Sequence, residues 1–151
     1  MKKTLVMAML LGMVSTMGFA AQGDISVLAG MGGNSAGQSA KGSNLGGGLR
    51  FDAGNGIVID GTIAYEDIGA TNEVAFNIEG YYHNFGLRIG QNQGDNGSTD
   101  LFYGLGFRVE QPVNENISVG IKANVLEIRP GMDLEIITGW QAYLVLAFMS
   151  I

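Results

Sequence analysis

The chain has 151 residues, contains no cysteine and carries a formal net charge of −6. A chain of this length is expected to form one domain, and without cysteine it has no disulfides to stabilise it. The acidic balance argues against nucleic acid as a partner, because nucleic-acid binding depends on basic patches.

The first residues have the pattern of a secretory signal peptide. Lys2 and Lys3 form a positive region, residues 5–19 form an uncharged apolar run, and small residues precede a predicted cut after Ala20. A retained transmembrane anchor needs about 20 apolar residues and a polar stop, and this run is shorter. We therefore expect residues 1–20 to be a cleaved signal peptide, which leaves six basic residues against 14 acidic ones.

The rest of the chain consists of segments in which apolar and polar residues alternate with a period of two, as in a β-strand. Eight strands are predicted, at 24–32, 45–51, 57–66, 73–82, 85–91, 100–111, 117–128 and 138–151. Tight turns at 52–55, 83–84 and 112–116 alternate with longer connections, of which 33–43 is expected to be a mobile loop. Short turns at one end and longer loops at the other are typical of an up-and-down outer-membrane meander.

Alternation alone does not say which face of a strand is buried, since a soluble barrel with an apolar core shows the same pattern. The face that carries the charges also carries repeated glycine, and an exposed strand gains nothing from glycine. The interior of an eight-stranded barrel has room only for side chains, so small residues fit there. We therefore predict that residues 21–151 form an all-β, eight-stranded antiparallel transmembrane barrel, with the polar face lining the lumen.

The inward face is predicted to hold a plug of ion pairs, because unpaired buried charges are costly. Its members are Arg50, Asp60, Glu66, Glu79, Arg88, Arg108, Glu110 and Lys122. The two-residue turn at His83 and Asn84 sets a register in which Glu79 lies opposite Arg88, and we expect these two to form an ion pair.

The outward face is predicted to contact lipid through Leu105, Phe107, Ile121 and Val125. Aromatic side chains on this face fall near both ends of the strands, as the two interfaces of a bilayer favour. Phe51, Tyr82 and Phe85 lie near the turns, and Tyr65, Tyr103 and Tyr143 or Trp140 lie near the loops.

In these features the mature chain resembles the small eight-stranded outer-membrane barrels of the OmpA and OmpX types. The most specific part is the final segment YLVLAFMSI, in which Tyr143, Val145, Ala147, Met149 and Ile151 look like the C-terminal assembly signal of that superfamily, with Ile151 in place of the usual aromatic. The resemblance implies the outer membrane of a Gram-negative-type bacterium, outer-membrane lipid and the barrel assembly machinery as partners, and no cofactor.

The same alternation places Ala142, Leu144, Leu146 and Phe148 on the inward face of the last strand. These apolar residues are either a hydrophobic part of the packed lumen or a small pocket for a lipid chain. The first alternative needs less free volume, and an eight-stranded barrel leaves little.

Three functions remain open. A structural or surface-interaction barrel with a plugged lumen is favoured over a narrow channel or transporter for small or hydrophobic solutes. A lipid-modifying enzyme is least supported, because the only histidine, His83, lies in a turn at the inferred periplasmic end, away from the outer leaflet. Absent cysteine and a single histidine also argue against a transition-metal site. We therefore predict no catalytic residue and no metal site, and the sequence names no external ligand.

Overall fold

The structure is a computed structural model that describes residues 23–36, 40–68, 71–94, 97–129 and 137–150. Its eight strands are β1 (Asp24–Ala36), β2 (Ala40–Gly54), β3 (Ile57–Ile68), β4 (Thr71–Tyr82), β5 (Phe85–Gly94), β6 (Thr99–Asn114), β7 (Ile117–Ile128) and β8 (Ile137–Ser150). Neighbouring strands pair antiparallel in chain order, and β1 also pairs with β8, so the sheet closes. The predicted fold class is confirmed. In the described ranges, no helix is long and apolar enough to cross a membrane.

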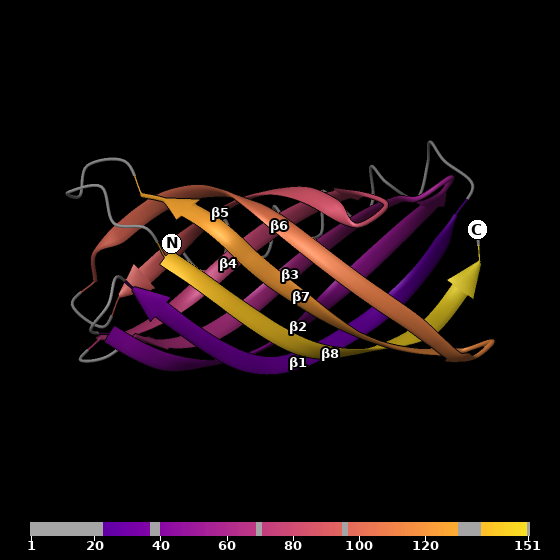
Figure 1. Cartoon of the computed structure of the whole chain (residues 1–151), viewed down its shortest axis with the longest axis horizontal. Helices are drawn as coiled ribbons and strands as arrows, with labels where there is room; N and C mark the ends of the chain where they lie inside the picture. Colours follow the sequence, from indigo (N-terminus) through magenta and orange to yellow (C-terminus); the bar gives the residue numbers. More distant parts are fainter. Residues whose placement is uncertain (1–22, 37–39, 69–70, 95–96, 130–136, 151) are drawn as a thin grey trace.

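The strands are steeply inclined to the long axis of the barrel, and β8 ends where β1 begins (Figure 1). The connections at this end are residues 55–56, 83–84 and 115–116. Asn55, Gly56 and His83 have φ angles of 52°, 79° and 54°, the left-handed conformations that two-residue hairpin turns require. We call this end of the barrel the turn end and the opposite end the loop end.

Six of the eight strands, β1 to β6, are longer than the sequence predicts, above all the two strands of the first hairpin. The prediction of a mobile loop at residues 33–43 is wrong for residues 33–36 and 40–43, because β1 and β2 stay paired as far as Ala36 and Ala40, and residues 37–39 lie outside the described ranges. On its other edge, β1 pairs with β8 over the same stretch, for example between Ser35 and Thr138. Backbone pairing on both sides of β1 therefore outweighs the low strand propensity of these glycine, serine and asparagine residues.

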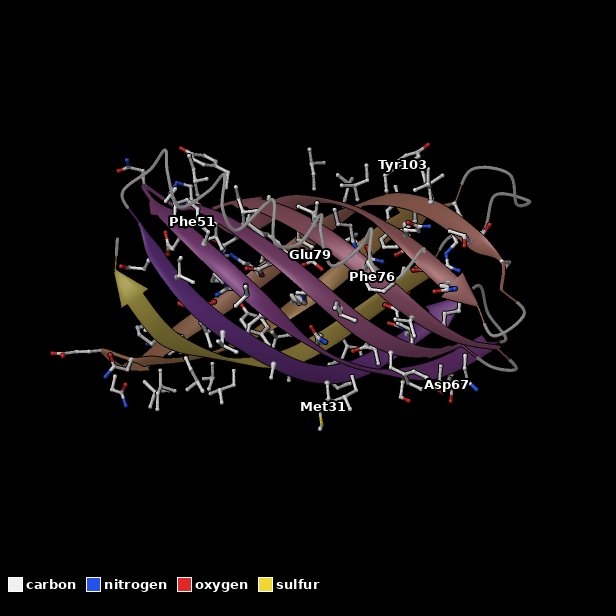
Figure 2. All side chains as sticks on the ribbon, turned by 180° about the vertical axis from the view of Figure 1, so that it is seen from behind. Met31, Phe51, Asp67, Phe76, Glu79 and Tyr103 are labelled. Carbon is white, nitrogen blue, oxygen red and sulfur yellow. The ribbon has the colours of Figure 1, made fainter. Side chains whose placement is uncertain are left out.

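The barrel is inside out compared with a soluble protein. Among the described residues, 12 polar or charged side chains are buried against nine hydrophobic ones, while 22 large hydrophobic side chains are exposed. Figure 2 shows this arrangement, with Met31 and Tyr103 projecting away from the ribbon and Glu79 within its outline. The charged faces of the strands line the lumen, and the apolar faces form the outer wall.

A β-bulge in β7 changes which side chains reach the lumen. Gly106 pairs with Asn124 and Leu105 pairs with Leu126, which leaves Val125 without a partner on β6. One extra residue reverses the alternation that follows it. Val125 is 57 % exposed, while Glu127 is buried at 2 % exposure.

A second irregularity corrects the predicted faces of β8. Ser26 pairs with Ala147 and Ile25 pairs with Met149, so the alternation changes phase between these pairs. Counting back from the C-terminus therefore gives the wrong face for the middle of the strand. The predicted outward Tyr143 and Val145 point into the lumen, each at 5 % exposure. The predicted inward set is exposed outside: Ala142, Leu144 and Leu146.

This correction removes the basis for an apolar pocket in the lumen, because three of its four supposed lining residues face outward. The fourth, Phe148, has no described side chain, and neither has Met149. Ile151 lies outside the described residues. The lumen instead contains a small apolar cluster of Leu28, Tyr143 and Val145.

Candidate functional site: the charged lumen

The lumen nearest the turn end is crossed by a group of charged side chains that we call the turn-end cluster. Arg50 on β2 binds its cross-strand partner Asp60 on β3 with two hydrogen bonds, from Nε to Oδ1 at 2.7 Å and from Nη2 to Oδ2 at 2.9 Å. Arg50 Nη1 also donates to Glu110 Oε2 on β6, across the barrel. Glu110 further accepts a hydrogen bond from the Tyr143 hydroxyl at 2.9 Å and lies 3.8 Å from Arg108 Nη1.

One ion pair fills the middle of the lumen. Lys122 Nζ on β7 lies 3.1 Å and 3.0 Å from the two carboxylate oxygens of Glu79 on β4. The Tyr81 hydroxyl donates to Glu79 Oε2 at 2.8 Å. Because β4 and β7 are not neighbours in the sheet, this middle pair connects opposite parts of the wall.

A third group, the loop-end cluster, centres on Glu127 and Arg129. Arg129 Nε lies 3.0 Å from Glu127 Oε1, and Arg129 Nη1 lies 2.9 Å from Glu73 Oε2. Arg88 Nη1 is 3.3 Å from Glu127 Oε2. Asn92 donates to Glu73 at 2.9 Å, so both carboxylates have amide or guanidinium donors.

The expected ion pair between Glu79 and Arg88 is wrong, although the register behind it is right. The two residues are direct backbone partners across β4 and β5. Arg88, however, turns its guanidinium over the Phe102 ring, 4.9 Å from the centroid, and pairs with Glu127. In a narrow lumen a long side chain reaches across the barrel as easily as to the next strand, so register alone does not choose its partner.

Every residue predicted for the plug lines the lumen, but Glu66 forms no ion pair with any described residue. Glu66 is buried beside its cross-strand partner Asn44. Among the described residues, the ion pairs of the lumen join five basic residues to five acidic ones, and Glu66 is a buried carboxylate outside these pairs.

Sequence reasoning missed Glu73, Glu127 and Arg129, which carry the loop-end cluster. Glu73 could have been found, because counting back from Glu79 in steps of two reaches it. Glu127 is hidden by the bulge at Val125, and Arg129 lies beyond the predicted strand.

The residues predicted to meet lipid lie on the outer wall. Leu105, Ile121 and Val125 are exposed there. Phe107 is half-buried because its ring packs edge-on against Phe85, with 5.3 Å between the centroids.

The predicted aromatic belts need two corrections. Tyr82 and Phe85 are exposed at the turn end, and Tyr65, Tyr103 and Trp140 are exposed nearer the loop end. Tyr143 is not among them, because it faces the lumen. Phe51 is only 7 % exposed, since its ring lies against Gly23, where an added Cβ would be 2.7 Å from Phe51 Cε2.

The lumen contains a small cavity between the charged groups. A cavity of about 40 Å³ lies among the polar side chains of the lumen, and its lining includes Asn44, Thr62, Glu66, Asn77 and Lys122. A space of this size holds a few water molecules at most. Over the described residues, no group of three or more His, Cys, Asp or Glu side chains is placed to hold a metal ion. His83 is exposed in its turn, where its ring contacts Tyr82.

The closed sheet, the charged lumen and the apolar wall together define the fold of an eight-stranded antiparallel transmembrane β-barrel. Among solved structures, the chain is similar to Neisserial surface protein A (NspA), with a TM-score of 0.62, 15% sequence identity and coverage of 82% of this chain and 97% of that one. A de novo designed protein, TMB2.3, matches with a TM-score of 0.48 and 12% identity, over 87% of this chain and 98% of that one. No family model and no curated protein matches the sequence. The likeness to NspA shows a shared fold.

Proposed function

We propose that the chain is exported, loses residues 1–20 and forms a non-catalytic barrel in the outer membrane of a Gram-negative-type bacterium, with a structural or surface-interaction role. The observation that carries this proposal is the filled lumen. Charged side chains bridge it at three levels, and the cavity among them is about 40 Å³. A hydrated ion would have to break several of these pairs to pass.

The outer wall supports a place in a membrane. Its exposed aliphatic side chains, Leu105, Ile121 and Val125 among them, would face the hydrocarbon. Tyr82 and Phe85 at one end, and Tyr65, Tyr103 and Trp140 nearer the other, would lie at the two interfaces. The name of NspA describes a surface protein, and we extend a surface location to this chain as part of the proposal.

Two partners follow from such a location. Outer-membrane lipid would cover the apolar wall, and the barrel assembly machinery would insert the chain by way of its C-terminal strand. Tyr143 and Val145 face the lumen once the barrel has closed. An assembly signal that uses them would therefore be read before closure.

Planar-bilayer conductance of the refolded mature chain tests the plug. We expect no steady current from the wild-type protein. A variant with alanine at the ion-paired residues of all three levels serves as the matched control and should conduct if it inserts, whereas Arg50→Ala, Asp60→Ala and Glu110→Ala alone leave the middle pair and the loop-end cluster in place. Steady conductance by the wild type would contradict the plug and support the narrow-channel alternative.

Cell fractionation tests the location separately. Expressed in a Gram-negative host, the full chain should lose its first 20 residues and separate with the outer membrane, with heat-modifiable migration in detergent gels. An uncleaved chain, or one found in the inner membrane, would contradict the location without bearing on the lumen.

A further inference from the structure

The loop-end half of the lumen contains a carboxylate that the ion pairs leave out. The ion pairs of the described residues use five basic side chains, each of which already has a carboxylate partner other than Glu66. Glu66 is only 7 % exposed. Its direct partner on β4 is Glu73, whose carboxylate is itself bound by Arg129 and Asn92. A buried charge without compensation is costly, so the Glu66 carboxylate requires either a proton or a positive partner other than these side chains.

The side chain beside Glu66 adds an acceptor oxygen and no donor. Asn44 is the direct partner of Glu66 across β2 and β3, and the side chains of such partners stand side by side. Asn44 Nδ2 donates to Asn34 Oδ1 at 2.8 Å and to the carbonyl of Trp140 at 3.3 Å. Both donor bonds are directed toward β1 and β8, and they leave Asn44 Oδ1 without a described donor. Two neighbouring acceptors therefore line the same cavity, and neither can donate to the other.

Three more oxygens line this cavity. Thr62 and Asn77 are direct partners across β3 and β4, both are buried, and neither Thr62 Oγ1 nor Asn77 Oδ1 bonds to a described protein group. Asn124 Nδ2 donates to Glu127 Oε2 at 3.1 Å, which leaves Asn124 Oδ1 as an acceptor without a described donor. Together with the carboxylate of Glu66, these groups are the oxygen ligands that hard cations prefer.

The basic side chains in the lining do not neutralise Glu66. Lys122 Nζ lies 3.1 Å and 3.0 Å from the two carboxylate oxygens of Glu79, and Arg88 pairs within the loop-end cluster. Two lining donors, Asn34 Nδ2 and Arg88 Nε, also lack a described partner. They can bond to water molecules that a partly hydrated ion retains.

Charge and size select among the cations. One uncompensated carboxylate matches one positive charge, whereas a divalent ion would bring excess charge into a buried site. Proteins also bind sodium and potassium through neutral oxygens such as carbonyls. A particle the size of water needs about 10–15 Å³, so the cavity of about 40 Å³ has room for one ion and about two water molecules.

We propose that this cavity is a binding site for one alkali cation, sodium or potassium, held by the Glu66 carboxylate and Asn44 Oδ1. The oxygens of Thr62, Asn77 and Asn124 belong to the same site. The cation compensates the carboxylate that the ion pairs leave out, and it joins β2 to β3 at this level of the lumen. The sequence-based expectation of no metal site rests on the absence of cysteine and the single histidine, ligands that alkali cations do not need.

The stability of the barrel tests this site, because a ligand that binds only the folded protein raises the midpoint of unfolding. The measurement is the urea midpoint of the refolded mature chain in vesicles of zwitterionic lipid at constant ionic strength, with choline chloride replaced stepwise by sodium chloride or potassium chloride. We expect the wild-type midpoint to rise with the concentration of at least one of the two cations. An equal midpoint in all three salts would overturn the proposal.

The substitution Glu66→Gln keeps the size of the side chain and removes its charge. This variant should lose the dependence of the midpoint on sodium and potassium. Glu115→Gln makes the same chemical change in an exposed turn, and it should keep the dependence of the wild type. A Glu66→Gln variant that responds to the cations as the wild type does would contradict the assigned site.

A crystal structure of the wild-type mature chain soaked in a thallium(I) salt requires no variant to fold. Thallium(I) replaces sodium and potassium and scatters anomalously, so we expect an anomalous peak within coordination distance of the Glu66 carboxylate and Asn44 Oδ1. A lumen without such a peak would overturn the proposal. An infrared band of a protonated carboxyl group that Glu66→Gln removes would show a proton in place of the cation and would overturn it as well. None of these results depends on whether the barrel conducts.

Discussion

The ring of Tyr143 lies directly over Gly120, its backbone partner across β7 and β8. A Cβ added at Gly120 would be 2.5 Å from Tyr143 Cζ, so no other residue fits there without displacing the ring. The guanidinium of Arg50 covers the same ring, 5.2 Å from its centroid. The ring is thus held between a glycine on one strand and a cation from another.

The same arrangement occurs at two other places in the lumen. Tyr81 is paired with Gly86 and covered by Arg108, and Phe102 is paired with Gly90 and covered by Arg88. In each case glycine makes room for a ring beside it, and the ring supports an arginine of the ion-pair network. This accounts for Gly86, Gly90 and Gly120, three of the glycines on the charged face.

Gly120→Val should therefore destabilise the barrel, by about 1–3 kcal/mol as for other overpacked interiors. The measurement is the free energy of unfolding in urea, in lipid vesicles. Gly61→Val is the matched control, because Gly61 faces the outer wall and has nothing within 4 Å of its added Cβ. An equal loss in both variants would show that strand glycine matters for the backbone and not for the ring.

Tyr143→Phe tests the corrected face of β8. If the hydroxyl binds Glu110 inside the lumen, its removal should cost about 1.5–3 kcal/mol, as for hydrogen bonds to charged groups. Tyr103→Phe, on the outer wall, is the control and should be close to neutral. If Tyr143→Phe left the free energy of unfolding unchanged, the result would support the original prediction that Tyr143 faces the lipid.

Two double-mutant cycles separate the true partner of Glu79 from its neighbour. Removing Lys122 leaves Glu79 without its ion-pair partner, at a cost of about 3–5 kcal/mol if the site is dry and less if water enters. The cycle of Glu79→Ala with Lys122→Ala should therefore show strong coupling, and the cycle of Glu79→Ala with Arg88→Ala a weaker one. If the coupling energy between Glu79 and Arg88 were the larger of the two, the ion pair expected from the register would be the correct one.

Ile121→Arg tests whether this position of the outer wall lies near the midplane of a bilayer. Arginine there should cost about 2–4 kcal/mol if the position lies near the centre of the hydrocarbon, and much less near an interface. Ile121→Leu controls for packing. A neutral arginine variant would argue that the 58 % exposed Ile121 side chain meets water.

Much of this architecture can be predicted from the sequence, because a period of two fixes both the strand and its faces wherever the strand is regular. From Arg50 to Lys122, the predicted lumenal residues all line the lumen. The pattern does not show where a β-bulge shifts the alternation of inward and outward residues by one position. A bulge adds one residue without any special side chain to mark it, so Val125 looks like any other apolar position.

The sequence pattern also does not predict which side chains of the lumen form ion pairs with one another. Cross-strand register places the backbone of Glu79 beside Arg88, but the final contacts depend on which side chains from distant strands reach the same point. Glu127 becomes available to Arg88 only through the bulge. Two errors of the sequence-based prediction, the missed loop-end carboxylate and the wrong ion pair, thus have one origin.

The extra residue in β7 also bears on how such barrels can diverge. A substitution alters one side chain, whereas deleting Val125 would remove the bulge and leave Leu126 and Glu127 opposite their present partners on β6, because Val125 has no partner there. Glu127 would keep its place in the lumen, so a residue can be gained or lost at this position without an exchange of lumenal groups. Distant barrels of this fold can be expected to differ in strand length at such points, and alignments that forbid a gap within a strand would hide the correspondence.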